Sequence, residues 1–269
     1  MRGGRRIRGR TIARWTILVL VGSYLLLPLV AMLDFSTRAP GGRRTLDPWL
    51  AIGQDEDLIE SIIVSLQIAV LTVVGVLVLL VPTMTWAYLR VPRMKRPIEF
   101  LCLLPLAIPA IVLVVGIAPI YGIIRRHATG SPLALVAIDI ILVLPFVHRA
   151  LDAGFRSIDV ATLAEAARSL GAGWPRIIVG IIVPNIRAAL LSAAVISVAL
   201  VLGEFTISSL LNYNTVQVVI NLLGKRDAFV AVAVSLGALI FAFLLILGVA
   251  SATPRGRRTV EDDAAVELS

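Results

Sequence analysis

Long apolar runs, separated by short polar or basic segments, dominate the chain. Six such runs follow one another: Trp15–Leu33, Ser61–Leu89, Phe100–Ile124, Leu133–Val147, Ile186–Leu211 and Ala228–Thr253. An α-helix needs about 20 mostly apolar residues to cross a bilayer, and four of the runs exceed that length. The pattern therefore predicts an all-α membrane protein with six transmembrane helices. They form one domain over residues 15–253, between a basic N-terminal segment (1–14) and a C-terminal tail (254–269).

The first apolar run follows a basic segment, as it would in a secretory signal peptide. The run is long, however, and Leu29-Val30-Ala31 lacks the small residue expected three positions before a cleavage site. We therefore expect an uncleaved first span.

The segment 150–185, between the fourth and fifth runs, has a helical pattern of its own. Apolar side chains fall at i, i+3, i+4, i+7 and i+10, on one face of a helix: Val160, Leu163, Ala164, Ala167 and Leu170. Ser157 or Asp159 can cap its start, and Gly171 suits the left-handed residue just beyond its end. Pro175 suits the first position of a second helix. The segment is thus predicted to be a short helix, a glycine turn and a helix leading into the fifth span.

This connector also carries a motif: Glu165, Ala166, Ala167, Gly171, Ile181, Val183 and Pro184. At these spacings between two spans it resembles the EAA loop of ABC importer permeases, which usually have Leu where this chain has Val183. The resemblance extends to six spans, over about residues 12–250. It implies a type I importer fold in which this cytoplasmic loop docks on a separate ATPase.

The distribution of charge predicts the orientation. Of the 25 Lys and Arg residues, 18 fall in the segments expected inside and 7 in those expected outside. Cytoplasmic loops of membrane proteins carry such an excess of basic residues. Both termini are therefore expected in the cytoplasm, and residues 34–60 and 212–227 outside. The outer segments are expected to hold a short interfacial helix and a partly re-entrant piece, Val216–Leu223.

The third run contains Pro105, Pro109 and Pro119. Prolines bend helices and free backbone carbonyls, which in lipid must be satisfied by neighbouring groups. We therefore expect a kinked third span packed inside the bundle.

Composition excludes several classes of function. The chain is 58% hydrophobic with a mean hydropathy of +0.95, and its basic residues flank apolar runs, so the net charge of +8 indicates a membrane rather than nucleic acid as partner. It has no GxxxxGK[ST] motif, so it does not bind ATP through a P-loop. Its two histidines are isolated, so we expect no metal site, and the single Cys102 allows no intrachain disulfide.

Two carboxylates, Asp139 and Glu204, interrupt apolar runs. Such residues are tolerated in a bilayer only when they face protein or water, which makes a role in transport the default hypothesis. A structural carboxylate is an equal alternative for Asp139. For Glu204 the transport role is favoured, because hydroxyl residues follow it, with Thr206 and Ser208 among them. Gly203-Glu204-Phe205 resembles a segment in permeases of the polyamine, phosphonate, iron and sulfate branch.

The family resemblance implies a transport subunit rather than an enzyme. It implies a cytoplasmic ATPase dimer that carries ATP and Mg²⁺, an extracytoplasmic substrate-binding protein and a second permease subunit, for which a different chain is favoured over a second copy. The location implied is a bacterial-type cytoplasmic (inner) membrane. Glu204 favours a cationic solute such as a polyamine, and so do the acidic residues expected outside, Asp55, Glu56 and Asp57. A phosphonate, another oxyanion or a ferric complex is the alternative solute.

Two other classes of membrane protein are alternatives. An ion-coupled secondary carrier would place carboxylates at broken helices and would need no docking loop. A scaffold without transport activity would not need Asp139 or Glu204 within the bilayer. The sequence leaves two roles for Trp174: its side chain packs against the ATPase, or it braces the loop from within.

Overall fold

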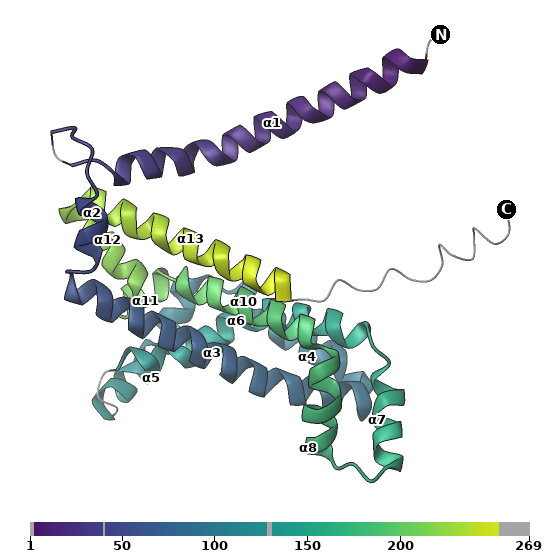
Figure 1. The fold of residues 1–269 in the computed structure, drawn as a ribbon. Coiled ribbons are helices and arrows are strands. Elements are labelled where there is room, and N and C mark those ends of the chain that lie inside the picture. The colour runs from purple at the N-terminus through teal and green to yellow at the C-terminus, as the bar shows by residue number, and fades with distance from the viewer. Residues whose placement is uncertain (1–2, 40, 128–130, 253–269) are drawn as a thin grey trace.

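The computed structural model describes residues 3–39, 41–127 and 131–252, and in these residues the regular elements are helices (Figure 1). The long ones are α1 (Gly3–Ser36), α3 (Glu56–Leu89), α5 (Ala110–His127), α6 (Val136–Arg156), α10 (Arg187–Leu202) and α13 (Ala228–Ala252). Shorter ones connect them: α2 (Asp47–Ile52), η1 (Pro92–Met94), α4 (Lys95–Leu103), η2 (Leu104–Ala107), η3 (Pro132–Leu135), α7 (Val160–Ser169), α8 (Trp174–Ile177), η4 (Ile178–Ile182), α9 (Val183–Asn185), α11 (Thr206–Leu210) and α12 (Val216–Arg226). The predicted tail 254–269 lies outside the described residues.

Five segments of the described chain are long and apolar enough to cross a membrane: Arg14–Ser36, Glu56–Leu89, Pro132–Arg156, Arg187–Leu210 and Ala228–Gly248. A sixth span forms if Pro92–Ala107 and Ala110–Gly122 count as one, although they meet at an angle of 100°. The all-α fold with six spans is therefore confirmed, with a broken third span.

The break in the third span is sharper than the kink predicted from its prolines. Ile108 is extended (φ −103°, ψ 117°), because a residue that precedes a proline is disfavoured in the helical region. The expectation that this span packs inside the bundle is wrong for much of α5, where Ile111, Val112, Val115 and Ile120 are exposed. The break turns α5 outward, so these side chains face away from the core.

The core of the bundle is made by α3, α6 and α10, each of which packs on the other two. Central α6 side chains such as Ile138, Val143 and Leu151 are almost completely buried. Glycine allows one of these contacts, since a Cβ on Gly154 of α6 would collide with Ala189 of α10. The core thus fixes the position of α6, which carries Asp139, and that of α10, which ends two residues before Glu204.

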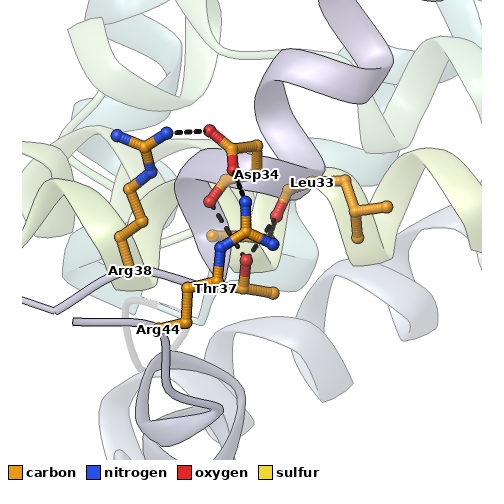
Figure 2. A network of polar contacts seen from close by, with 6 residues as sticks. Leu33, Asp34, Thr37, Arg38 and Arg44 are labelled. Atoms are coloured by element: carbon orange, nitrogen blue, oxygen red, sulfur yellow. Dashed lines mark hydrogen bonds and ion pairs between the residues drawn. The ribbon is translucent and has the colours of Figure 1, made fainter. Parts of the chain in front are cut away.

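Helix α1 stands apart from the bundle and approaches it only near its C-terminal end (Figure 1). There Phe35 stacks on Phe229 with ring centroids 4.7 Å apart, and the Trp49 indole donates to Ser36 Oγ at 3.3 Å. Figure 2 shows the polar contacts that follow, in which Asp34 accepts from Arg38 and, at 3.0 Å, from Arg44. These contacts order the predicted outer segment, in which α2 is the expected short helix.

The two ends of the bundle differ. Helices α7 and α8 project as a hairpin from one end, and α1 begins and α13 ends on that same side (Figure 1). Helices α2 and α12 lie at the other end. The predicted re-entrant piece is the first part of α12, which packs on α3 and α13.

Candidate coupling hairpin and carboxylate cavity

Helix α7 begins and ends with specific capping contacts. The Asp159 carboxylate accepts from the Thr162 hydroxyl at 2.7 Å and from the Thr162 backbone N–H at 3.2 Å. These hydrogen bonds hold the pKa of Asp159 below its ordinary value. Of the two predicted caps of α7, Asp159 is therefore the correct one, whereas Ser157 is the C-cap of α6, where its hydroxyl donates to the Gly154 carbonyl.

The turn after α7 is left-handed at Gly171, as predicted, with φ +81°. The Gly171 N–H donates to the Arg168 carbonyl at 2.9 Å, and the Ala172 N–H to the Ala167 carbonyl at 3.0 Å. These two bonds form a Schellman motif, which satisfies the last carbonyls of the helix. The turn reverses the chain and lets α8 run back beside α7.

The hairpin buries one face of α7 and exposes the other. Val160, Ala164 and Ala167 are buried, whereas Glu165 and Ala166 are exposed. Leu170, which the spacing placed on the same face as these residues, is instead 89% exposed. Leu170 follows the last helical residue, so the helical period no longer determines the direction of its side chain.

The second arm of the hairpin contains a wide helical turn. Gly173 precedes α8, so Trp174 is its first residue and Pro175 its second, one position later than predicted. The π-helical η4 precedes Pro184. Proline has no backbone N–H, so the regular pattern of α-helical hydrogen bonds cannot continue through this residue. Ile181 is half-buried and Pro184 is exposed. The Asn185 side chain donates to the Ile181 carbonyl at 2.7 Å, which satisfies that group at the break.

Asp139 and Glu204 line one cavity of about 260 Å³ inside the bundle. The other lining residues are apolar: Pro105, Leu106, Ala110, Leu142, Val143, Phe146, Leu200, Val201 and Ile207. The structure therefore brings together the two carboxylates that lie 65 positions apart in the sequence. A cavity with apolar walls and two carboxylates suits a cation that carries apolar surface, since opposite charge is favoured in a low dielectric.

Glu204 has a structural task that the sequence did not predict. The fifth span breaks after Leu202, and Glu204 stands before the new helix α11. Its two carboxylate oxygens accept from the backbone N–H groups of Ile207 (2.6 Å) and Ser208 (3.0 Å) and from the Ser208 hydroxyl (2.9 Å). The carboxylate thus caps the first turn of α11, where N–H groups have no helical acceptor. In the sequence, the signal for this cap was Gly203, followed directly by the carboxylate of Glu204 and, four residues after Glu204, by the hydroxyl of Ser208.

The other predicted pathway residues are arranged differently. Asp139 is only 4% exposed, and it has neither a hydrogen bond nor an ion pair within the described part of the chain. Thr206 and Ser209, the other hydroxyl residues that follow Glu204, are exposed and give it no hydrogen bond within the described residues. Ser208 is the hydroxyl residue that does hold it. Of the two carboxylates, Asp139 is therefore the one that no described protein group donates to, whereas Glu204 already accepts three hydrogen bonds.

A polar cluster at the hairpin end of the bundle was missed by sequence reasoning. The Tyr88 hydroxyl donates to Asp152 at 2.7 Å, and Arg156 Nε lies 2.7 Å from the same carboxylate. Lys95 Nζ lies 3.5 Å from the centroid of the Tyr88 ring. The cluster joins α3, α4 and α6, and its sequence signal was the i, i+4 spacing of Asp152 and Arg156.

Comparison with known proteins is consistent with this arrangement. The family model described as "Binding-protein-dependent transport system inner membrane component" matches residues 80–253, which include the hairpin and both carboxylates. Among solved structures, the chain is similar to one in a bacterial ABC transporter involved in the import of the acidic polysaccharide alginate. The TM-score is 0.68 at 17% identity, over 92% of this chain and 98% of that one, so this likeness concerns the fold. No curated protein matches the chain in sequence.

Proposed function

The chain belongs to the family of binding-protein-dependent transport system inner membrane components, so it is a permease component of an ABC importer, and we propose that its α7–α8 hairpin docks on the ATPase. The family implies an ATPase and a substrate-binding protein as separate chains. This chain then contributes the membrane pathway and carries out no bond chemistry.

The exposed tip of the hairpin carries the proposal. Leu170 is 89% exposed and stands beside the left-handed Gly171, while Glu165 is exposed on the outer face of α7. The tip therefore offers a partner protein both an apolar and a charged side chain, the kinds of contact found at the core and at the rim of protein interfaces. The predicted docking residues Glu165, Ala166, Ala167 and Gly171 all lie on this hairpin, with Ile181 and Pro184 on the arm that leads to α10. Displacement of the docked tip would therefore move the fifth span.

The proposed assembly follows from the same arrangement. One six-span chain supplies half of a pathway, so a second permease subunit is required, and we propose a different chain for it. ATP and Mg²⁺ would bind to the ATPase dimer alone. The hairpin end, with the start of α1 and the end of α13, would face the cytoplasm of a bacterial-type cell, and the α2–α12 end would face the binding protein.

For the solute, we propose a cation with apolar surface, such as a polyamine. Asp139 and Glu204 in one apolar cavity support this, together with the acidic N-terminal turn of α3, which contains Asp55, Glu56 and Asp57. A polyanion such as alginate, the cargo of the structurally similar transporter, would be repelled by two carboxylates. Asp139, Glu204 and Ser208 would line the route, with Thr206 at its exposed edge.

The proposed function predicts that uptake depends on ATP and on the ATPase. Vesicles that contain the complete transporter should accumulate radiolabelled polyamine only with ATP inside and binding protein outside. Vesicles without the ATPase subunit are the control and should show no uptake. Uptake by the permease chains alone, driven by an ion gradient, would identify a secondary carrier and contradict the proposal.

The proposed orientation predicts how single cysteines react. Leu50 in α2 is 65% exposed, and Ser169 at the hairpin is also exposed, whereas the native Cys102 is buried. In intact cells a membrane-impermeant maleimide should therefore label Leu50→Cys but label Ser169→Cys only after the cells are opened. The chain without either substitution is the control. Labelling in the opposite order would invert the orientation.

A further inference from the structure

The side chain of Trp174 lies between two arginines from different parts of the hairpin end. The guanidinium carbon of Arg90 is 5.2 Å from the centroid of the indole, and that of Arg168 is 5.6 Å from it. Both distances lie within the range of a cation–π contact. Arg90 and Arg168 are not paired with a carboxylate in the described residues, where the ion pairs involve Arg38, Arg44 and Arg156.

The three side chains come from three separate elements. Arg90 is the C-cap residue that follows α3, Arg168 lies in the last turn of α7, and Trp174 is the first residue of α8. Arg168 and Trp174 therefore flank the exposed turn that carries Leu170 and Gly171. Arg90 lies two residues after Tyr88, whose hydroxyl bonds to Asp152 of α6. The indole thus connects the tip of the hairpin to the end of α3, which is itself fixed to α6.

We propose that Trp174, held between Arg90 and Arg168, is a positioning residue that fixes the hairpin tip to the end of α3, so that movement of the docked tip reaches the α3–α6 pair as well as α10. The buried packing of Val160, Ala164 and Ile177 holds the base of the hairpin, whereas the indole acts at the turn. The proposal rests on the proposed docking role of the hairpin. Of the two roles open for Trp174 from the sequence, these contacts support the brace within the chain.

The first test measures the clamp on the purified chain, without transport. Trp174→Leu should raise hydrogen exchange of the amides of α7 and of the turn about fivefold, the size expected when two exposed cation–π contacts are lost. Arg90→Gln should raise it less. Trp86→Leu is the matched control, because Trp86 also lies near the end of α3 but is exposed, and it should leave the exchange of α7 unchanged. Unchanged exchange in Trp174→Leu would overturn the clamp.

The second test measures ATP hydrolysed per solute imported by the complete transporter. Trp174→Leu should raise this ratio about fivefold while the yield of the complex stays at the level of Trp86→Leu. Trp174→Phe, which keeps an aromatic face, and Arg90→Lys, which keeps the charge, should restore most of the coupling. Adding Arg90→Gln to Trp174→Leu should have little further effect, because both remove the same contact.

The possible outcomes separate this inference from the proposed function. If Trp174→Leu lowers complex yield and transport together at a constant ATP ratio, the role is structural and the inference is wrong. Additive effects of the two substitutions would also overturn it. Absence of ATP-driven uptake by the unmodified transporter would contradict the proposed function, and with it the coupling role, while the exchange measurement would still decide whether the clamp exists.

Discussion

Replacing Gly171 with valine should lower ATP-driven uptake about fivefold to thirtyfold, the range that corresponds to about 1–2 kcal/mol of strain in a left-handed residue. The native φ of +81° lies in a region that β-branched residues almost never adopt. Beyond its two chain neighbours, no atom lies within 4 Å of a Cβ built on Gly171, so the effect comes from the backbone and not from a collision. The valine variant would relieve its strain by opening the Schellman turn, which would displace Leu170.

Asparagine at position 171 is the matched control, because it is polar and of similar size but tolerates the left-handed region. Gly171→Asn should retain most of the uptake, and both variants should show normal amounts of chain in the membrane. The measurements are uptake in vesicles, ATP hydrolysis and co-purification of the ATPase. Equal uptake by the valine and asparagine variants would mean that the turn geometry is irrelevant to coupling.

Glu165 provides an independent check of the same surface. Its side chain is exposed, so Glu165→Ala removes a charge without disturbing the interior of the hairpin. If the ATPase contacts this face, less of it should co-purify with the alanine variant. A double variant with Gly171→Glu and Glu165→Ala that still binds the ATPase and imports solute normally would contradict the docking role.

The sequence predicted the hairpin well because local chemistry determines it. Asp159 can reach only the first turn of α7, and Gly171 is suited to a conformation that other residues avoid. The same local reasoning failed at Leu170, where one residue beyond the helix end was enough to turn the side chain outward. The period of a helix predicts a face only as far as the helix extends.

Contacts between distant segments were beyond the sequence. Nothing in the local pattern shows that Arg90 and Trp174, 84 positions apart, meet at one indole. The prolines of the third span predicted a bend, but the 100° angle and the exposure of α5 depend on how α5 packs against its neighbours. For Glu204, the sequence showed only that a carboxylate interrupts an apolar run. The structure was needed to show that the fifth span breaks at Gly203 and that this carboxylate caps α11.

The largest effect on the solute is expected from Asp139. Asp139→Asn keeps the shape of the side chain and removes its charge from the cavity of about 260 Å³. Since a hydrogen bond to a charged group contributes about 1.5–3 kcal/mol, loss of this carboxylate should lower uptake of a cationic solute about tenfold to hundredfold. The yield of the complex should not fall, because Asp139 has no hydrogen-bond partner within the described residues that the substitution would leave unsatisfied.

Glu204 should behave differently although it lines the same cavity. Both of its oxygens accept hydrogen bonds from the start of α11, and glutamine offers only one acceptor oxygen in their place. Glu204→Gln turns an amide N–H₂ toward a backbone N–H, which costs about 1–3 kcal/mol for the donor left unsatisfied. The yield and the uptake should therefore fall together, and Glu204→Leu should be worse. Ser209→Ala is the control in the same segment, because that hydroxyl is exposed and lies outside the cap.

Comparison of the Asp139 and Glu204 variants also tests whether the solute is a cation or an anion. For a cationic solute, uptake divided by yield should fall sharply in Asp139→Asn and only slightly in Glu204→Gln. For an anionic solute such as a phosphonate, removal of the negative charge at Asp139 should leave uptake unchanged or increase it, since like charges repel in a low dielectric. Normal uptake of every tested solute by Asp139→Asn would remove this cavity from the transport route and leave Asp139 as a structural carboxylate.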